Sequence, residues 1–188
     1  PLAGLNRAFV AKGLKQLNKT KNLGFNALLN ECRIEKGTIK SFEVGHIIAP
    51  RINAMGRLGS ALDALRALCT KDKEKSQALI QVLQTTNTQR QELTWSTVDE
   101  ALKRAMEWKN EKLIVLSSKE YHEGVIGLIA GKLMEEFAKP AIVISIGEGV
   151  AKASTRSVKG VNIVELIRQV RDELIDVGGH PMAAGFSL

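Results

Sequence analysis

The sequence predicts an α/β protein in which a helical N-terminal segment, a long connecting helix and a domain with a mixed sheet follow one another. Three observations carry this prediction. Residues 4–33 repeat apolar side chains at helical spacing, residues 71–108 contain neither glycine nor proline, and residues 112–188 alternate short apolar strands with helical segments. Such an alternation is typical of a partly parallel sheet flanked by helices.

The N-terminal part is predicted to be mainly helical. Apolar side chains recur near helical spacing through residues 4–20, and residues 24–33 form a second such stretch, with Gly24 at the break between them. Residues 38–50 fit either a helix or a strand. Pro50 is expected to break any helix there, because the residue before a proline avoids helical geometry.

Residues 71–108 are predicted as one long polar helix. A helix with few apolar positions commonly bridges two lobes instead of lying inside one core, so we interpret it as a connector. A sparse seam of contacts is expected along it, formed by Ala78, Val82, Asn87, Leu93 and Val98.

The C-terminal part is predicted to form the sheet. The expected strands are residues 112–118, 140–147, 149–155 and 183–188, and the expected helices are residues 122–138 and 162–178.

The composition is that of a soluble globular protein. Of the 188 residues, 44% are apolar and 25% are charged, which argues against global disorder, and no apolar run is long enough to span a membrane. The N-terminus shows no pattern of a targeting peptide. Cys32 and Cys69 form no CxxC pair, so we expect reduced thiols and a cytoplasmic location.

Basic residues gather at the N-terminus. The net charge is +7, and residues 1–30 hold five basic side chains and no acidic one. Such a surface fits a polyanionic partner such as nucleic acid, and it fits a solvated helix face equally well. Aromatic residues make up only 4% of the chain, which argues against a base-stacking platform for single strands.

Candidate anion-binding side chains occur at the ends of predicted strands. Ser117, Ser118 and His122 follow one strand at the start of a helix, whose N–H groups and positive dipole end favour an anion. Alternatively, Ser118 is a cap and His122 a surface residue. Ser154 and Arg156 occupy alternate positions at the end of another strand, so both can face one way as a phosphate clamp, unless the segment is a solvated loop.

The string VGGHPMAAGF is the most unusual one in the C-terminal part. Gly178 and Gly179 indicate a backbone that approaches a ligand closely, with the imidazole of His180 projecting into the site. A plain turn would also use the two glycines, but it would not require the His-Pro pair and the small residues that follow.

The sequence contains no pattern for self-contained catalysis. His46, His122 and His180 lack partners at metal-ligand spacing, and no HExxH, CxxC, GxSxG, P-loop or GxGxxG string occurs. We therefore expect no catalytic residue and no metal ligand in this chain.

Two arginines lie in an apolar setting. A buried and unpaired arginine is costly, and no acidic residue occurs between Glu43 and Asp63. Arg51 and Arg57 must therefore be paired from elsewhere or line a cleft, and the lack of local acids favours the cleft.

Several strings together resemble the RecJ-like single-strand-specific exonucleases of the DHH phosphoesterase superfamily. They are PRINAMGRLGSA, the long polar helix, EYHEGVIGLIAGKL, STRS and GGHPMAAGFSL, in this order. The resemblance implies that residues 1–70 are the C-terminal part of a catalytic DHH domain, 71–110 a connector helix, and 111–188 a DHH-associated substrate-binding domain. It also implies a substrate cleft between the domains, and two Mn²⁺ or Mg²⁺ ions held by residues upstream of this fragment.

The resemblance also assigns substrate-contacting positions. They are Arg51, Asn53, Arg57, His122, Ser154, Arg156, Gly178, Gly179 and His180. The arginine motif would contact phosphates from one wall, the serine–arginine pair would clamp a phosphate end, and the Gly-Gly-His loop would face the metal centre. Tyr121 stands where such sequences more usually have tryptophan, and STRS lacks a glycine often found there.

The function implied by the resemblance is 5′→3′ hydrolysis of single-stranded DNA in repair and recombination, with single-stranded DNA and other repair proteins as partners. These residues would position phosphates, and the chain alone would be inactive. Two alternatives stay open: a phosphodiesterase for oligonucleotides or cyclic dinucleotides in the same superfamily, and a non-catalytic nucleic-acid-binding module. No membrane partner is expected.

Overall fold

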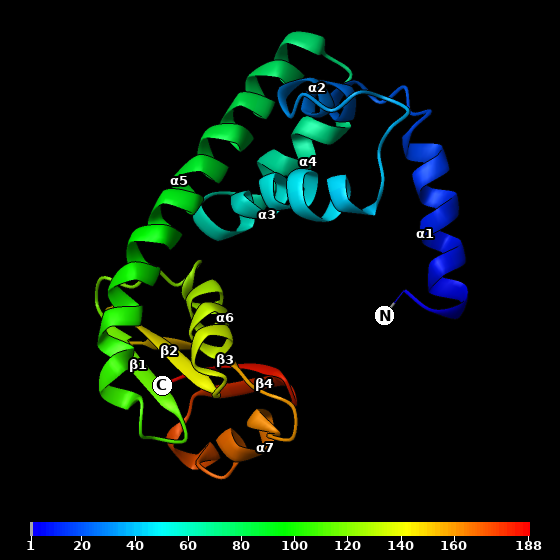
Figure 1. Cartoon of the computed structure of the whole chain (residues 1–188). Helices are drawn as coiled ribbons and strands as arrows, with labels where there is room; N and C mark the ends of the chain where they lie inside the picture. The colour runs from blue at the N-terminus through cyan, green and yellow to red at the C-terminus, as the bar shows by residue number, and fades with distance from the viewer. Residues whose placement is uncertain (1) are drawn as a thin grey trace. The chain divides into compact units, whose positions relative to one another are not determined.

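The computed structural model describes residues 2–188, which form two compact units (Figure 1). The first unit ends at Arg90 and the second begins at Gln91. The boundary lies within one continuous helix, α5 (Lys73–Ala105), whose first half belongs to the first unit and whose second half belongs to the second.

The first unit is entirely helical. Its elements are α1 (Gly4–Leu17), α2 (Leu23–Glu31), the π-helical turn η1 (Glu43–Ile48), α3 (Ala49–Leu58), α4 (Ala61–Cys69) and the first half of α5. Fully buried leucines from α2 and α5 form the centre of its core, together with Met55 of α3 and Ala67 of α4. Helix α1 has no buried residue and contributes only Leu14 and Leu17 to the edge of this core.

The structure places Gly24 differently from the prediction. It is the second residue of α2 and is buried, so it does not separate two helices. A Cβ atom at this position would lie 1.9 Å from the carbonyl oxygen of Ala67, so the missing side chain lets α2 and α4 pack closely.

The predicted break at Pro50 is also wrong. Ala49 has helical dihedral angles, φ −60° and ψ −38°, and its N–H donates to the carbonyl oxygen of Val44 in a π-type turn. Pro50 follows in the first turn of α3, where a missing N–H costs little. The π-helical turn η1 thus runs directly into α3, so residues 41–50 are helical, whereas residues 38–40 belong to neither a helix nor a strand.

The seam of α5 is partly different from the predicted one. The predicted Ala78 and Val82 are exposed, whereas the predicted Asn87 is buried. Ile80 and Leu83, which were not predicted, are buried as well. The buried stripe also includes Ser76 and Thr86, so apolarity alone does not identify the packed side in the first half of the helix. In the second half of the helix, the predicted Leu93 and Val98 are partly buried against the core of the second unit.

The second unit is built on a five-stranded sheet in the order β1-β2-β3-β5-β4. Its strands are β1 (Ile114–Ser118), β2 (Ala141–Ile146), β3 (Ala151–Arg156), β4 (Asp176–His180) and β5 (Ala183–Ser187). Strands β1 and β2 are parallel, and all other neighbours are antiparallel. The predicted α/β class, with a long helix and a mixed sheet flanked by helices, is therefore confirmed.

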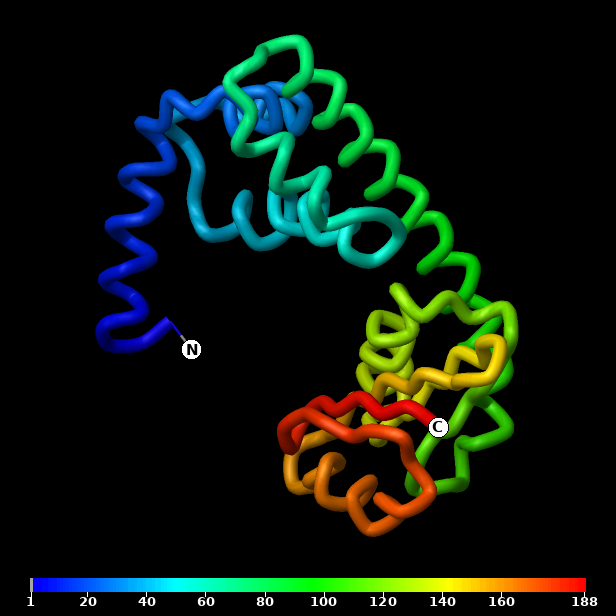
Figure 2. Tube along the Cα trace, turned by 180° about the vertical axis from the view of Figure 1, so that it is seen from behind, coloured from blue at the N-terminus to red at the C-terminus, as the bar shows by residue number. Residues whose placement is uncertain are grey.

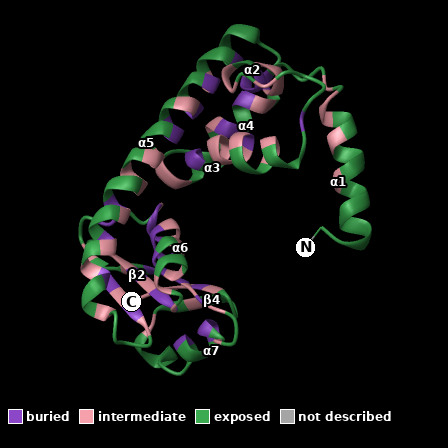
Figure 3. Cartoon of the chain, viewed as in Figure 1, coloured by how far each residue is buried: buried purple, intermediate pink, exposed green. Residues whose placement is uncertain are grey.

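Two helices cover opposite faces of this sheet. Helix α6 (Ile126–Phe137) packs on β2 and β3 with Val143 in its core, and α7 (Ile163–Arg168) packs on β4 and β5 with Phe186 in its core. Val143 pairs with Ser154, and Ser154 pairs with Gly185, so these three positions lie on the same face of the sheet. Phe186 follows Gly185 in β5 and therefore points to the opposite face, because side chains alternate along a strand. Figure 3 shows the buried positions on both helices.

The predicted helix over residues 162–178 is much shorter. Helix α7 ends at Arg168, a 3₁₀ turn η3 (Arg171–Glu173) follows, and β4 begins at Asp176. Residues 176–178 are extended because they pair with β5 and because this pairing packs Val177 into the core against α7. The β4–β5 hairpin lies at one edge of the sheet (Figure 2, red).

Within residues 2–188 we find no helix that is both long and apolar enough to span a membrane.

Candidate functional site

Ser154 and Arg156 lie together beneath the start of α6. Arg156 Nη1 donates to Ser154 Oγ at 3.3 Å and to the carbonyl oxygen of Thr155 at 2.7 Å. Gly127, in the first turn of α6, makes room for both: a Cβ there would lie 2.9 Å from Ser154 Oγ and 3.2 Å from Arg156 Nη2. A hydroxyl, a guanidinium and a helix N-terminus therefore meet at one place, which suits a phosphate.

The strand register extends this site toward His180. Arg156 pairs with Ala183, which pairs with His180, so the three side chains share the α6 face in one row. The next row holds Ser154, then Gly185 and Gly178. The floor between the serine–arginine pair and the edge strand thus carries only small residues. His180 is exposed, and its Nδ1 accepts a 3.4 Å hydrogen bond from the N–H of Met182.

The two glycines before His180 have different roles. Both lie in strand β4 instead of a loop, and the turn after them is made by Pro181 and Met182. Gly179 has φ +149°, and a Cβ there would lie 2.4 Å from the Cα of Ala184, so it serves the pairing of β4 with β5. A Cβ at Gly178 would meet open space, so only this glycine leaves the shared face uncovered.

His122 lies in the segment between β1 and α6. Its Nδ1 accepts a 2.9 Å hydrogen bond from the N–H of Gly124, and the residue is exposed. The next residue, Glu123, forms a 2.6 Å ion pair with Lys152 of β3, whose hydrogen bond lowers the pKa of Glu123. Ser118 Oγ accepts from the N–H of Glu120 in a local turn, and α6 begins at Ile126 without a side-chain cap.

Tyr121 has an unusual environment. It is 3% exposed, its hydroxyl donates to Glu100 Oε2 at 2.6 Å, and Arg104 Nη1 donates to it at 3.1 Å. Burial, followed by the hydrogen bond to Glu100, raises the pKa of Tyr121 to about 12.

Tyr121 is the single tyrosine of the chain, so this pKa can be measured directly. The phenolate absorbance should rise with a midpoint near pH 12, as the raised pKa requires. The Glu100→Gln variant should titrate closer to the ordinary value of about 10. The folded pKa exceeds the unfolded one, so the associated stabilisation is complete below pH ~10 and is lost as the pH rises toward the folded pKa. A midpoint near 10 in the unaltered, folded chain would contradict the hydrogen-bonded geometry.

In the first unit, Arg51 is held by neutral groups. Its Nε donates to Gln84 Oε1 of α5 at 2.7 Å, and its Nη1 donates to the carbonyl oxygen of Ile47 at 2.7 Å. The arginine is half-buried. Of the two possibilities that the sequence leaves, pairing from a distant element therefore applies to Arg51.

Asn53 and Arg57 lie on another side of α3. They are four residues apart and so share one helix face, whereas Arg51 and Arg57 lie about 120° apart around the axis. Burial, followed by the charge of Arg57, lowers the pKa of Arg90 of α5. Arg90 Nη2 donates to Oδ1 of Asn87, which is 2% exposed. The charge of Arg57 therefore acts on a second arginine, which lies on α5.

Sequence reasoning missed Arg90 and Gly127. Arg90 follows Asn87 by three residues, a spacing that permits a hydrogen bond on a helix, and this signal was present in the sequence. Gly127 is one glycine among 16, and only the packing of α6 on β3 distinguishes it.

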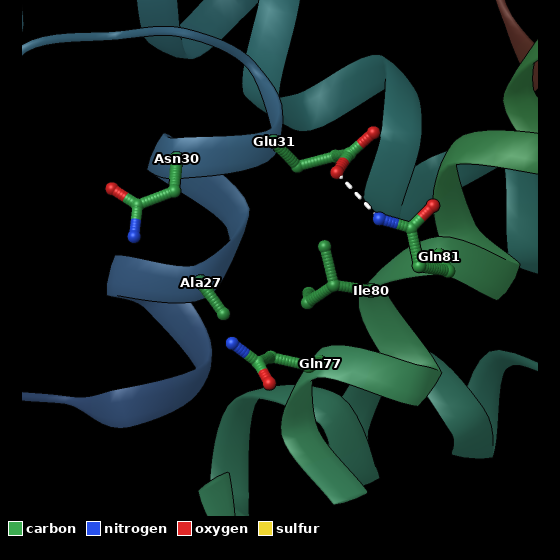
Figure 4. A pocket seen from close by; sticks show the side chains of 6 residues that line it. All are labelled: Ala27, Asn30, Glu31, Gln77, Ile80 and Gln81. Atoms are coloured by element: carbon green, nitrogen blue, oxygen red, sulfur yellow. Dashed lines mark hydrogen bonds between the residues drawn. The ribbon is translucent and has the colours of Figure 1, made fainter. Parts of the chain in front are cut away.

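A pocket in the first unit does not involve any of these residues. It has a volume of about 410 Å³ and lies between α2 and α5 within the first unit (Figure 4). Its lining residues are Ala27, Asn30, Glu31, Gln77, Ile80 and Gln81. Gln81 Nε2 donates to Glu31 at 2.6 Å across it. Among residues 2–188, no group of three or more histidine, cysteine or acidic side chains could hold a metal ion.

Comparison with known proteins shows which sequences this chain resembles. Residues 110–188 match the family model of the DHHA1 domain. The whole chain is 36% identical to a single-stranded-DNA-specific exonuclease RecJ of Bacillus subtilis (strain 168), covering 24% of that protein. It is 37% identical to the RecJ of Thermus thermophilus, covering 27% of it. The chain thus spans about a quarter of the length of these curated relatives.

Solved structures of RecJ are also similar to this chain. A crystal structure of RecJ in complex with Mg²⁺ from Thermus thermophilus superposes with a TM-score of 0.89, over 100% of this chain and 29% of that one, at 37% identity. A structure of exonuclease RecJ bound to manganese gives a TM-score of 0.83, with 46% of that chain covered.

Proposed function

Because residues 110–188 match the DHHA1 domain family and the whole chain is similar to RecJ exonucleases, we propose that it binds phosphates for a 5′→3′ exonuclease acting on single-stranded DNA. The proposal includes a role in DNA repair and recombination, a cytoplasmic location, and other repair proteins as partners. The observation that carries it is the meeting of Ser154, Arg156 and the first turn of α6 at Gly127.

The chemistry of this meeting point fits a terminal phosphate. A guanidinium offers several N–H donors in a plane, which match two phosphate oxygens, and the hydroxyl of Ser154 adds another donor. The N–H groups at the start of α6 add partial positive charge. The uncovered floor at Gly178 leaves space for a nucleotide, with the imidazole of His180 in the neighbouring row.

The first unit would supply a second set of phosphate contacts. The charge of Arg57 lowers the pKa of Arg90, and the negative charge of a bound phosphate would favour the charged form of both guanidiniums. Asn53 shares the face of Arg57 and can donate from its amide. Arg51 would hold α3 against α5 through Gln84, and its remaining donors would reach the substrate.

The relatives were solved with Mg²⁺ or Mn²⁺. The described residues of this chain do not fit a metal site, so we propose that two such ions are held by parts of the protein outside these 188 residues. Divalent ions at such a centre activate water and stabilise the leaving oxygen. The residues of this chain would hold the phosphates in line, which supplies the positioning part of catalysis.

The 188-residue chain should bind single-stranded DNA and should not cleave it. With Mn²⁺ present, we expect no release of nucleotides from a 5′-labelled strand, whereas a protein of the relatives' full length should degrade it. Binding should be tighter for a 5′-phosphorylated strand than for the same strand with a 5′-hydroxyl. Metal-dependent cleavage by these 188 residues would contradict the assignment, and so would equal affinity for both strands.

A further inference from the structure

A hydrogen-bonded network joins α5 to the segment that leads into α6, entirely within the second unit. Arg104 donates to the Tyr121 hydroxyl at 3.1 Å and to Glu100 at 3.3 Å, and its Nη2 donates to the carbonyl oxygen of Ser117 at 3.0 Å. The Tyr121 hydroxyl in turn donates to Glu100 at 2.6 Å. The network therefore holds this segment at the end of β1 and again at Tyr121.

The residues on both sides of His122 are anchored. Tyr121 is tied to α5 through the network, and Glu123 is tied to β3 by its ion pair with Lys152. Between them, His122 Nδ1 accepts from the N–H of Gly124. A neutral imidazole with Nδ1 as acceptor carries its proton on Nε2, so the ring presents Nε2–H as its donor.

Core packing alone does not explain this network. The Tyr121 ring is buried in the apolar core of the second unit, where a phenylalanine would fill the same space. A buried hydroxyl is costly unless it is hydrogen-bonded, and here its two partners are charged residues of α5. The hydroxyl therefore links the segment to α5, which is a different role from filling the core.

We propose that Glu100, Arg104 and Tyr121 are positioning residues for His122: they hold the segment that leads into α6 so that the imidazole keeps Nε2–H as a donor for a phosphate bound by Ser154 and Arg156. This inference rests on the proposed function, because it takes the phosphate bound by Ser154 and Arg156 as the ligand. It adds three residues that lie outside the predicted set of substrate-contacting positions.

The first test follows His122 without any ligand. In the 188-residue chain, Tyr121→Phe and Arg104→Met should each raise the exchange rate of the Gly124 amide about tenfold or more, and should mix the two imidazole tautomers of His122 in ¹⁵N spectra. The matched control is Lys103→Met, which removes the neighbouring, exposed ion pair with Asp99 on the same helix. Unchanged Gly124 exchange and an unchanged tautomer in both variants would overturn the proposal.

The second test measures coupling. Arg104→Met and His122→Ala should each weaken binding of a short 5′-phosphorylated oligodeoxythymidylate by about three- to tenfold, and the double variant should be no weaker than His122→Ala alone. Additive losses would show that Arg104 acts independently of His122 and would overturn the proposal. If the unaltered chain fails to bind the oligonucleotide, the proposed function fails, while the exchange and tautomer measurements still decide whether the network positions His122.

Discussion

Replacing Arg156 with methionine should weaken binding of a 5′-phosphorylated single strand by about 10- to 100-fold. Hydrogen bonds to charged groups contribute about 1.5–3 kcal/mol each, which corresponds to this range. Methionine keeps much of the side-chain volume beside Gly127 but removes the planar donors that now contact Ser154 Oγ and the backbone. The measurement is fluorescence anisotropy with a labelled strand, or KM in a full-length enzyme.

The matched control is Arg168→Met. Arg168 is an exposed arginine of α7 that pairs with Glu165 at 2.7 Å, and α7 covers the opposite face of the sheet. Both variants lower the net charge equally, so a purely electrostatic attraction would weaken binding to the same extent in both. Equal losses in the two variants, or no loss with Arg156→Met, would exclude the phosphate clamp. With the 5′-hydroxyl strand, the losses of affinity caused by Arg156→Met and by Arg168→Met should differ much less.

Replacing Leu83 with alanine should destabilise the first unit by about 2–5 kcal/mol. Its side chain is fully buried among leucines of α2 and Met55, and truncation of a buried leucine leaves a cavity as well as losing apolar contacts. The loss should appear as a lower urea midpoint in the far-ultraviolet circular dichroism, which is dominated by helices.

Two features of the chain make this experiment specific. Val82→Ala is the control, because Val82 is 46% exposed and its truncation should change stability by less than about 0.5 kcal/mol. Both tryptophans, Trp95 and Trp108, lie in the second unit, so their fluorescence reports on that unit separately. If Val82→Ala costs as much as Leu83→Ala, the seam predicted from the sequence would be the correct one after all.

The strands of the second unit were largely predictable because apolar runs bounded by glycine and proline leave few alternatives. β1, β2, β3 and β5 lie within or next to the predicted ranges. Alternation along β3 also predicted that Ser154 and Arg156 share a face, which the contact between them bears out. Strand β4 was not predicted, because its first residues continue the pattern that predicted a helix over residues 162–178. Its extended conformation depends on pairing with β5.

The positions in the first unit were harder to predict, because long-range packing decides them. Arg51 donates to Gln84 on α5, and the charge of Arg57 acts on Arg90, also on α5. Nothing local marks these pairs. In the same way, the buried stripe of α5 includes Ser76 and Thr86, which were not in the predicted seam, so burial there follows from the neighbouring helices and not from hydrophobicity.

Sequence periodicity was therefore sufficient for the α/β class, for the long helix and for the residue types that can bind a phosphate, since these depend on local spacing and side-chain chemistry. Tertiary structure alone decided which of those residues meet. The approach of α6 to β3 at Gly127 and the anchoring of Tyr121 by α5 join residues distant in the chain. Their contacts arise only when the helices and strands pack, because no local pattern specifies a partner so far away.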